Sequence, residues 1–178
     1  MKVKDRDFDI FISEKELAGI VRSVAEKVNA DYEPDGGSPL LVCPVLTGAF
    51  MFASDLVRRL TMECEVRFVR YSSYSGMSST GEVKCMLPFP PEVKGRDVLI
   101  VEDVVDSGLS MKKMLEEVWA LKPRSVRVCT LFYKPAAFKE DFKVDYEGRE
   151  IGNEFIVGYG LDYDEHGRGL KDVWVVRG

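Results

Sequence analysis

The sequence lacks a long hydrophobic run and a closely spaced cysteine pair, and it has only one histidine. No apolar segment approaches the roughly 20 residues that a bilayer-spanning helix needs. Residues 1–11 are too highly charged for a signal peptide. The four cysteines are widely separated and His166 has no second histidine, so the sequence does not support a metal cluster of these residues. We therefore expect a cytoplasmic protein without membrane contact.

An excess of positive charge is also missing. The chain has 25 Lys and Arg against 30 Asp and Glu, which gives a formal net charge of −5. Proteins that bind nucleic acid or anionic lipid mainly through charge have a basic excess, so nucleic acid is not an expected partner. If the protein binds phosphate, it must use a local arrangement of residues. A length of 178 residues with 46% hydrophobic residues is typical of one globular domain, which we expect over residues 1–178.

Hydrophobic periodicity predicts alternating helices and strands. A helix over Ser13–Val28 follows from apolar residues at helical spacing behind a capping box of Ser13 and Glu16. The other predicted elements are a strand at Leu40–Leu46, a helix beginning near Ala49, strands at Val66–Tyr71, Val98–Val101 and Val126–Phe132, a helix through Met111–Val118, and short strands at Phe155–Val157 and Val173–Val176. This alternation indicates an α/β domain with a mainly parallel sheet flanked by helices.

Three segments directly follow predicted parallel strands. They are Thr47–Gly48, Glu102–Ser110 and Lys134. Ligands of open α/β sheets bind beyond the carboxyl ends of the strands, so we expect the site there. Asp106–Ser110 opens a helix with small residues and hydroxyl groups, which suits a phosphate monoester held by backbone N–H groups. The carboxylates just before it can bind sugar hydroxyls or Mg²⁺.

A purely structural role competes with this hypothesis, because Asp103 or Asp106 could merely cap the helix. Three carboxylates within five positions, at Glu102, Asp103 and Asp106, exceed what capping needs. The sequence has no G-x-x-x-x-G-K-[ST] motif, and no G-x-G-x-x-G motif follows the first core strand. The pattern therefore favours a phosphate site that is neither a Walker loop nor a dinucleotide-binding loop.

The segment Val98–Ser110, VLIVEDVVDSGLS, resembles a known signature. It is similar to the 5-phosphoribosyl 1-pyrophosphate (PRPP) motif of the type I phosphoribosyltransferases, in the form found in the purine-salvage branch. Further matching segments occur in the family's order over nearly the whole chain: PVLTGAFMF from Pro44, SSYSGMSSTG from Ser72, LFYKP from Leu131 and FIVGYGLDYDEHGR from Phe155. The resemblance implies a twisted, mainly parallel sheet, a small hood formed by the two chain ends, a lid loop at about 72–83 and a base-recognition region at about 134–178.

The resemblance also implies a role for each matched residue. Asp106 would be the general base that takes the N7 proton of the purine as N9 attacks C1′ of the ribosyl group. Lys134 would donate to the 6-oxo group of the base, Phe155 would stack on the base, and the backbone at Ile156 would meet its Watson–Crick edge. The residues implied to bind the 5′-phosphate and ribose of PRPP are Glu102, Asp103, Asp106, Ser107, Gly108, Leu109 and Ser110.

Three further groups complete the implied site. They are Thr47, Gly48 and Arg168 for pyrophosphate; Glu102, Asp103 and Asp162 for Mg²⁺, with Asp162 also beside the purine; and Ser73 and Tyr74 for the lid that excludes water. Two features depart from the family pattern. Many members have Lys where this chain has Thr47, so a role of that Lys does not carry over. The run Tyr163–Leu170 is rich in glycine and lacks the bulky aromatic residue often found before the arginine, which leaves the base preference open.

The implied activity is that of an enzyme. It would be a Mg²⁺-dependent transferase that moves the phosphoribosyl group from PRPP to hypoxanthine, and also to guanine, with release of pyrophosphate. Members of the family form dimers and tetramers. The consecutive apolar residues Phe50, Met51 and Phe52 fit a subunit interface, so we expect a homodimer or homotetramer.

Three alternatives stay open on the sequence alone. A transferase for xanthine or a pyrimidine would share the fold, although Lys134 followed by the Phe155 segment favours a 6-oxopurine. An RNA-binding regulator built on the same fold would need a basic face, which the acidic balance disfavours. A signalling receiver domain can also carry VLIVED, but near its amino terminus and with a phosphoacceptor Asp further downstream.

Overall fold

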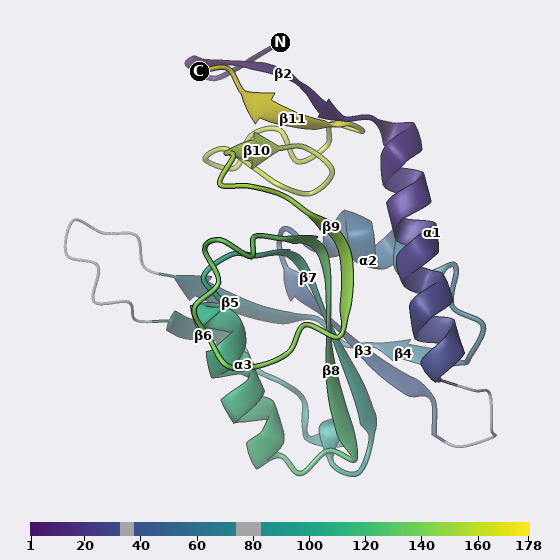
Figure 1. Cartoon of the computed structure of the whole chain (residues 1–178). Coiled ribbons are helices and arrows are strands. Elements are labelled where there is room, and N and C mark those ends of the chain that lie inside the picture. Colours follow the sequence, from purple (N-terminus) through teal and green to yellow (C-terminus); the bar gives the residue numbers. More distant parts are fainter. Residues whose placement is uncertain (33–37, 74–82) are drawn as a thin grey trace.

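A computed structural model describes residues 1–32, 38–73 and 83–178 (Figure 1). The helices in these ranges are α1 (Glu14–Asp31), α2 (Phe50–Val57), α3 (Leu109–Ala120) and the short 3₁₀-helix η1 (Pro91–Val93). The strands of the larger sheet are β3 (Leu40–Leu46), β4 (Cys64–Val66), β5 (Val69–Ser73), β6 (Val83–Leu87), β7 (Asp97–Val105), β8 (Ser125–Tyr133) and β9 (Tyr146–Glu150). The strands of the smaller sheet are β1 (Lys2–Val3), β2 (Arg6–Ile12), β10 (Ile156–Val157) and β11 (Val173–Val176).

The larger sheet is mainly parallel. Its strand order is β6-β5-β3-β7-β8-β9, and β4 also pairs with β3. All of these pairs are parallel except β5 with β6. The predicted α/β fold with a mainly parallel sheet is therefore confirmed. This arrangement brings the carboxyl ends of β3, β7 and β8 to one edge of the sheet, where the sequence predicts the site.

Helices cover both faces of the larger sheet. Leu99 and Val101 of β7 are fully buried in a cluster with residues of α1 and α2. Val98 and Ile100 of the same strand are fully buried in a second cluster with residues of α3. Because neighbouring side chains of a strand point to opposite faces, a strand covered on both faces needs an unbroken apolar run, and the sequence of β7 has one.

The smaller sheet contains both ends of the chain. Its order is β1-β2-β11-β10, and all of its pairs are antiparallel. Figure 1 shows this sheet beyond one end of the larger sheet, with α1 running alongside both. Ile12 and Val173 of the smaller sheet belong to the same core cluster as Val42 of β3, so one apolar core joins the two sheets. The predicted hood of both chain ends is confirmed.

Helix α1 begins where the sequence predicts. Ser13 is its N-cap: the backbone N–H of Glu16 donates to Ser13 Oγ at 3.3 Å, and the backbone N–H of Ser13 donates to Glu16 Oε2 at 2.9 Å. This reciprocal pair satisfies two donors that the first helical turn would leave free. No helix in the described ranges is long and apolar enough to span a membrane.

The prediction of a single strand over Val66–Tyr71 is wrong. Two strands, β4 and β5, occur instead, and both pair with β3 in the same register, from Leu40 opposite Cys64 to Leu46 opposite Arg70. This register places Pro44 opposite Phe68. Proline has no N–H group to donate to a neighbouring strand, which accounts for the break in the ladder at this position.

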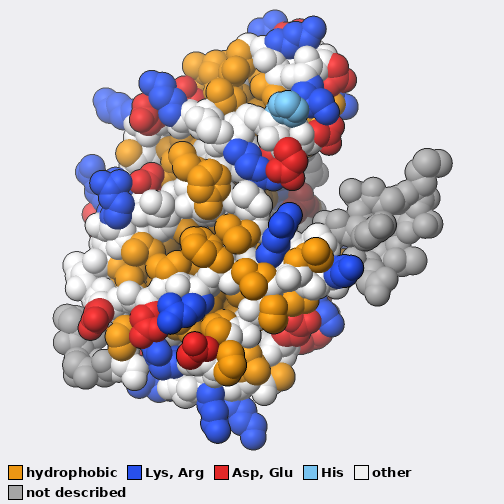
Figure 2. All heavy atoms as spheres, turned by 180° about the vertical axis from the view of Figure 1, so that it is seen from behind, with side chains coloured by type: hydrophobic (Ala, Val, Ile, Leu, Met, Phe, Trp, Pro, Cys, Tyr) orange, Lys and Arg blue, Asp and Glu red, His pale blue; other side chains and the backbone are white. Residues whose placement is uncertain are grey.

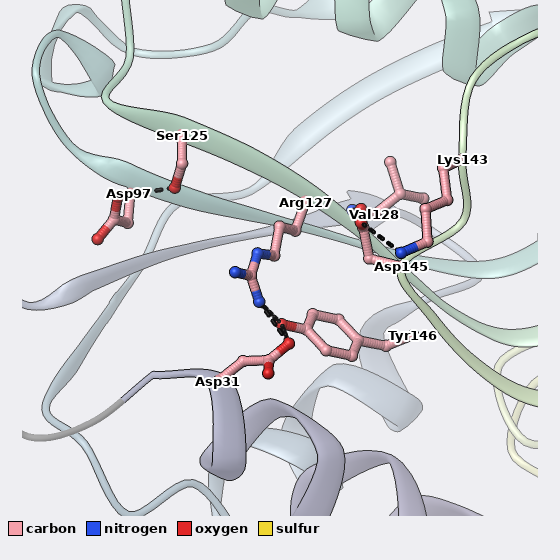
Figure 3. A network of polar contacts seen from close by, with 8 residues as sticks. All are labelled: Asp31, Asp97, Ser125, Arg127, Val128, Lys143, Asp145 and Tyr146. Atoms are coloured by element: carbon pink, nitrogen blue, oxygen red, sulfur yellow. Dashed lines mark hydrogen bonds and ion pairs between the residues drawn. The ribbon is translucent and has the colours of Figure 1, made fainter.

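A polar network lies at the amino end of the larger sheet (Figure 3). Arg127 of β8 forms an ion pair with Asp31 of α1 at 2.5 Å and donates to the hydroxyl oxygen of Tyr146, the first residue of β9. The Tyr146 hydroxyl in turn donates to Asp31 Oδ2 at 2.9 Å. Nearby, Ser125 Oγ donates to Asp97 Oδ1 at 2.7 Å. The network ties the end of α1 to β8 and β9.

Candidate active site

Two adjoining hollows lie at the carboxyl edge of the larger sheet. The smaller, of about 160 Å³, is lined by the continuous segment Glu102–Met111. The larger, of about 330 Å³, is lined by residues from four separate parts of the chain, among them Thr47, Gly48, Glu102, Asp103, Asp162 and Arg168. Glu102, Asp103 and Ser110 border both hollows. The structure thus brings together the segments that the sequence places after β3 and β7.

Glu102 and Asp103 are the sixth and seventh of the nine residues of β7, in partly buried positions. The backbone N–H of Asp103 donates to Glu102 Oε1 at 3.0 Å, and that of Val104 donates to Asp103 Oδ1 at 2.7 Å. Burial, together with the neighbouring Asp103, raises the pKa of Glu102 well above its usual range. Burial also raises the pKa of Asp103. A cation next to two adjacent, buried carboxylates would stabilise their charged forms.

Gly48 makes room for Asp103. A Cβ atom added to Gly48 would lie 1.7 Å from Asp103 Oδ2, a distance too short for two non-bonded atoms. The loop after β3 therefore approaches the carboxylate with backbone alone. The peptide bond just before this loop, between Leu46 and Thr47, is cis. Thr47 is exposed, and it lines the larger hollow together with Gly48.

The predicted phosphate segment joins β7 to α3. Asp106 and Ser107 are exposed, Gly108 has a φ of 86°, and Leu109 is the first residue of α3. The predicted start of a helix in this segment is confirmed. The first N–H groups of a helix have no partner within it, and they form a favourable place for a phosphate group. The smaller hollow is bounded by these residues and by Ser110.

Lys134 connects the phosphate segment to the predicted base-recognition region. Its Nζ lies 3.2 Å from Asp106 Oδ2 and donates to the backbone oxygen of Glu154 at 3.2 Å. The Lys134 side chain is only 12% exposed, whereas that of Asp106 is 56% exposed. A lysine this buried is held in one place, so its ammonium group lies at a fixed point between the two regions.

Phe155 and Ile156 follow directly after Glu154. Ile156 is buried in β10, but Phe155 is 40% exposed, and its ring contacts Tyr163 edge-on with ring centroids 5.5 Å apart. A core aromatic would be buried, so this exposure agrees with an aromatic surface on which a ligand ring can stack. Neither residue borders the two hollows, and the link to them runs through Lys134.

Arg168 is held by three acceptors. Its Nη2 lies 2.9 Å from Asp162 Oδ1 and 3.0 Å from Glu165 Oε2, and its Nη1 donates to the backbone oxygen of Gly160 at 2.9 Å. The sequence pattern identified Asp162 and Arg168 but not Glu165 or Gly160. Tyr71, which also lines the larger hollow, was missed too, since nothing in its sequence context sets it apart from a strand residue.

The acidic residues fit a magnesium ion only in part. In the described part of the chain, no group of three or more His, Cys, Asp or Glu side chains could hold a metal ion alone. Glu102 and Asp103 are adjacent, and Asp162 borders the same hollow but is paired with Arg168. Carboxylate oxygens are the ligands that Mg²⁺ prefers, and Mg²⁺ often takes further oxygens from substrate phosphates. The donor set therefore suits Mg²⁺ that arrives with a phosphorylated ligand.

The two predicted lid residues cannot be placed in the site. Ser73 is the last residue of β5, and Tyr74 and most of the predicted lid at 72–83 lie outside the described residues. Their predicted role stays untested.

Fold and site together define a class of protein, the type I phosphoribosyltransferases. A parallel sheet carries, at one edge, a helix start suited to phosphate, an adjacent carboxylate pair and a backbone loop facing an arginine. The family model for the phosphoribosyl transferase domain matches residues 11–164.

Comparison with individual proteins is more specific. The hypoxanthine-guanine phosphoribosyltransferase of Mycobacterium tuberculosis (strain H37Rv) is 39% identical over 166 residues, which cover 91% of this chain and 82% of that protein. The hypoxanthine phosphoribosyltransferase of Salmonella typhimurium is 38% identical over 166 residues, with 93% of each chain covered. A crystal structure of a hypoxanthine-guanine phosphoribosyltransferase from Bacillus anthracis has a TM-score of 0.87 at 34% identity, covering 97% of this chain and 99% of that one. The chain belongs to the phosphoribosyl transferase domain family and, within it, to the hypoxanthine-guanine phosphoribosyltransferases of purine salvage.

Proposed function

We propose that this protein transfers the 5-phosphoribosyl group from PRPP to N9 of hypoxanthine, and also of guanine, which yields IMP or GMP and pyrophosphate. The observation that carries the proposal is the pair of adjoining hollows, which unites Glu102–Met111 with Thr47–Gly48 and Arg168. The names of the relatives, which state hypoxanthine or hypoxanthine-guanine specificity, support the choice of base.

PRPP would extend across both hollows. Its 5′-phosphate would lie in the smaller one, against the N–H groups at the start of α3 and the hydroxyls of Ser107 and Ser110. Glu102 and Asp103, which border both hollows, would bind the ribose hydroxyls. The pyrophosphate group would lie in the larger hollow, where backbone N–H groups at Thr47–Gly48 and the guanidinium group of Arg168 can bind phosphate oxygens.

The purine would lie on the Lys134 side of the site. Lys134 already bonds to two oxygens, one on Asp106 and one at Glu154, so a 6-oxo group could replace either as an acceptor. Phe155 offers an exposed ring for stacking, and the backbone at Ile156 would read the Watson–Crick edge.

Asp106 would act as the general base. When Lys134 turns to the 6-oxo group, the Asp106 carboxylate loses its cationic partner and becomes free to accept the N7 proton as N9 attacks C1′. A carboxylate at this place also stabilises positive charge that develops on the ribosyl ring. The other residues bind and orient the two substrates around the reacting atoms.

Glu102 and Asp103 would hold Mg²⁺ together with oxygens of the ligand, and Asp162 borders the same hollow. The ion would supply positive charge that offsets the charge of the departing pyrophosphate. The raised pKa of Glu102 beside Asp103 supports this assignment, because a cation there would relieve the repulsion between the two carboxylates.

We also propose that residues 1–178 act as one unit, which the apolar core shared by the two sheets supports. An apolar groove of about 280 Å³ beside α2, lined among others by Phe50, Val57 and Phe68, supports a second copy of the chain as a partner. Figure 2 shows hydrophobic side chains gathered on the face that bears α2. The lid role of Ser73 and Tyr74 and a cytoplasmic location stay predictions from the sequence.

The test is a panel of free bases incubated with PRPP and Mg²⁺, with nucleotide formation followed by chromatography. We expect turnover with hypoxanthine and guanine. Turnover restricted to xanthine or a pyrimidine would move the protein to another substrate class of its family. No turnover of any 6-oxopurine would reject the proposal.

A further inference from the structure

The segment Gly158–Gly160 connects β10, the proposed base-binding strand, to the loop that carries Arg168. Its three residues all have positive φ, at 108°, 51° and 101°, which is rare for a residue such as Tyr159. The backbone N–H of Gly160 donates to the backbone oxygen of Arg168 at 2.9 Å. Arg168 Nη1 donates back to the oxygen of Gly160, also at 2.9 Å. The position of this segment therefore fixes the position of Arg168.

The same segment packs against the proposed pyrophosphate loop. A Cβ atom on Gly160 would lie 2.1 Å from the backbone oxygen of Gly48, so the two backbones touch directly. Gly48 is in turn pressed against Asp103. Gly160, Gly48 and Asp103 thus form a continuous row of close contacts that ends at the lining of the larger hollow, and a shift of Gly160 would displace Gly48.

Tyr159 anchors this segment to α2. Its side chain is 7% exposed within the main core, and its hydroxyl donates to Asp55 Oδ2 at 2.6 Å. Asp55 lies on α2, which begins two residues after Gly48. Burial, and then the hydrogen bond to Asp55, raise the pKa of the Tyr159 hydroxyl, so it stays protonated and remains a donor at neutral pH. One hydrogen bond therefore joins the element that follows β10 to the element that follows the pyrophosphate loop.

We propose that Tyr159 and Asp55 are positioning residues that hold the base-binding strand β10 and the pyrophosphate loop Thr47–Gly48 in one fixed arrangement. Both side chains lie outside the two hollows, so they act through the backbone of Gly158–Gly160 and not by touching a substrate. This inference rests on the proposed function, because it assumes that these two elements bind the two substrates.

The decisive variant is Tyr159→Phe, which removes the hydroxyl and keeps the buried ring. Tyr146→Phe is the matched control, because Tyr146 is 3% exposed and its hydroxyl also donates to an aspartate, Asp31, but at the amino end of the sheet (Figure 3). For both variants we would measure kcat, the KM of hypoxanthine and of PRPP, the melting temperature, and the Kd of pyrophosphate with Mg²⁺ by calorimetry.

We expect Tyr159→Phe to raise the KM of hypoxanthine and the Kd of pyrophosphate by roughly tenfold each, the scale of a lost hydrogen bond to a charged acceptor, with kcat changed by less than about threefold. Tyr146→Phe should lower the melting temperature as well but leave these constants within about twofold of the wild type. Asp55→Asn, which keeps an oxygen acceptor, should stay closer to the wild type than Asp55→Ala.

Unchanged constants in Tyr159→Phe, or equal changes in Tyr146→Phe, would overturn the inference. A wild-type protein that formed no nucleotide from hypoxanthine would instead reject the proposed function. Even then the pyrophosphate measurement decides the inference, because it does not depend on the base.

Discussion

At the amino end of the larger sheet, acidic and basic side chains pair with one another: Asp31 with Arg127, and Asp97 with Arg124 (Figure 3 shows the first pair). At the carboxyl end, Glu102 and Asp103 face two hollows and adjoin each other, and neither forms an ion pair with a lysine or arginine among the residues that the structure describes. Acidic residues therefore form ion pairs at the amino end of the sheet and line the candidate site at its carboxyl end.

The pKa shifts at the two ends run in opposite directions. The hydrogen bond from Arg124 lowers the pKa of Asp97, whereas burial beside Asp103 raises that of Glu102. A lowered carboxyl pKa means that the folded state stabilises the charged form, and a raised one means that it does not. The amino end thus contributes to stability, while at the carboxyl end burial disfavours the charged forms of Glu102 and Asp103, a cost that a bound cation would offset. A carboxyl pKa that is raised by burial is typical of functional sites.

The largest expected effect is that of Asp106→Asn at the carboxyl end. It should lower kcat by a factor on the order of 10²–10⁴, because the amide cannot accept the N7 proton. PRPP binding and the melting temperature should change little, since the Asp106 side chain is 56% exposed. Steady-state kinetics, calorimetry and thermal unfolding check these points, and an unchanged rate would reject Asp106 as the base.

Lys134→Ala should come next in size. We expect the KM of hypoxanthine to rise by roughly 10- to 100-fold, as for a lost charge-assisted hydrogen bond, and the KM of PRPP to rise less. Lys143→Ala at the amino end is the control, because Lys143 is 81% exposed and pairs with Asp145 only at 3.9 Å. Equal effects of Lys134→Ala on both substrates would argue against base recognition by this residue.

Two glycine substitutions distinguish an effect on the kinetics from an effect on stability. Gly48→Ala should lower kcat/KM for PRPP by about tenfold, because the new Cβ must displace the Asp103 carboxylate, and overpacking of this kind costs roughly 1–3 kcal/mol. Gly19→Ala in α1 meets nothing within 4 Å, so it should raise the free energy of unfolding by about 0.5–1 kcal/mol without changing the kinetics. Wild-type kinetics in Gly48→Ala would show that the close contact with Asp103 is not needed.

The smallest effect concerns stability at the amino end. Because the pKa of Asp97 is lowered in the folded protein, its contribution is present above the ordinary Asp value of about 3.9 and is lost as the pH falls through the lower folded value. Asp97→Asn should therefore lower the free energy of unfolding by about 1 kcal/mol at pH 7 and by less at pH 3. Urea unfolding at both pH values measures this, and a difference that grew toward acid pH would contradict the assignment.

Local sequence signals predicted the elements that they encode. The capping box of Ser13 and Glu16 marked the start of α1, and the apolar run of β3 matched the strand from Leu40 to Leu46. Strand β7 was predicted too short, because its pairing with β8 continues past the apolar run, from Glu102 opposite Thr130 to Val105 opposite Tyr133. That continuation depends on the neighbouring strand, which periodicity does not reveal.

Contacts between residues far apart in the chain could not be predicted from the sequence. Residues Asp55 and Tyr159 are 104 positions apart, and nothing near either one indicates the other. The edge strand β9 was not predicted, because its polar sequence, YEGRE, lacks the apolar alternation of a buried strand. In the site, the motifs identified Glu102, Asp103 and Arg168, but the third acceptor around Arg168, at Gly160, follows from tertiary packing alone.

In the proposed function, the carboxyl edge of the sheet transfers a phosphoribosyl group to a 6-oxopurine with the help of Mg²⁺. The most direct measurement incubates the protein with hypoxanthine and PRPP and quantifies IMP and pyrophosphate together, with Mg²⁺ and after complete chelation. We expect equal amounts of both products with Mg²⁺ and neither product after chelation. Nucleotide formation that survives chelation, or pyrophosphate released without IMP, would contradict it.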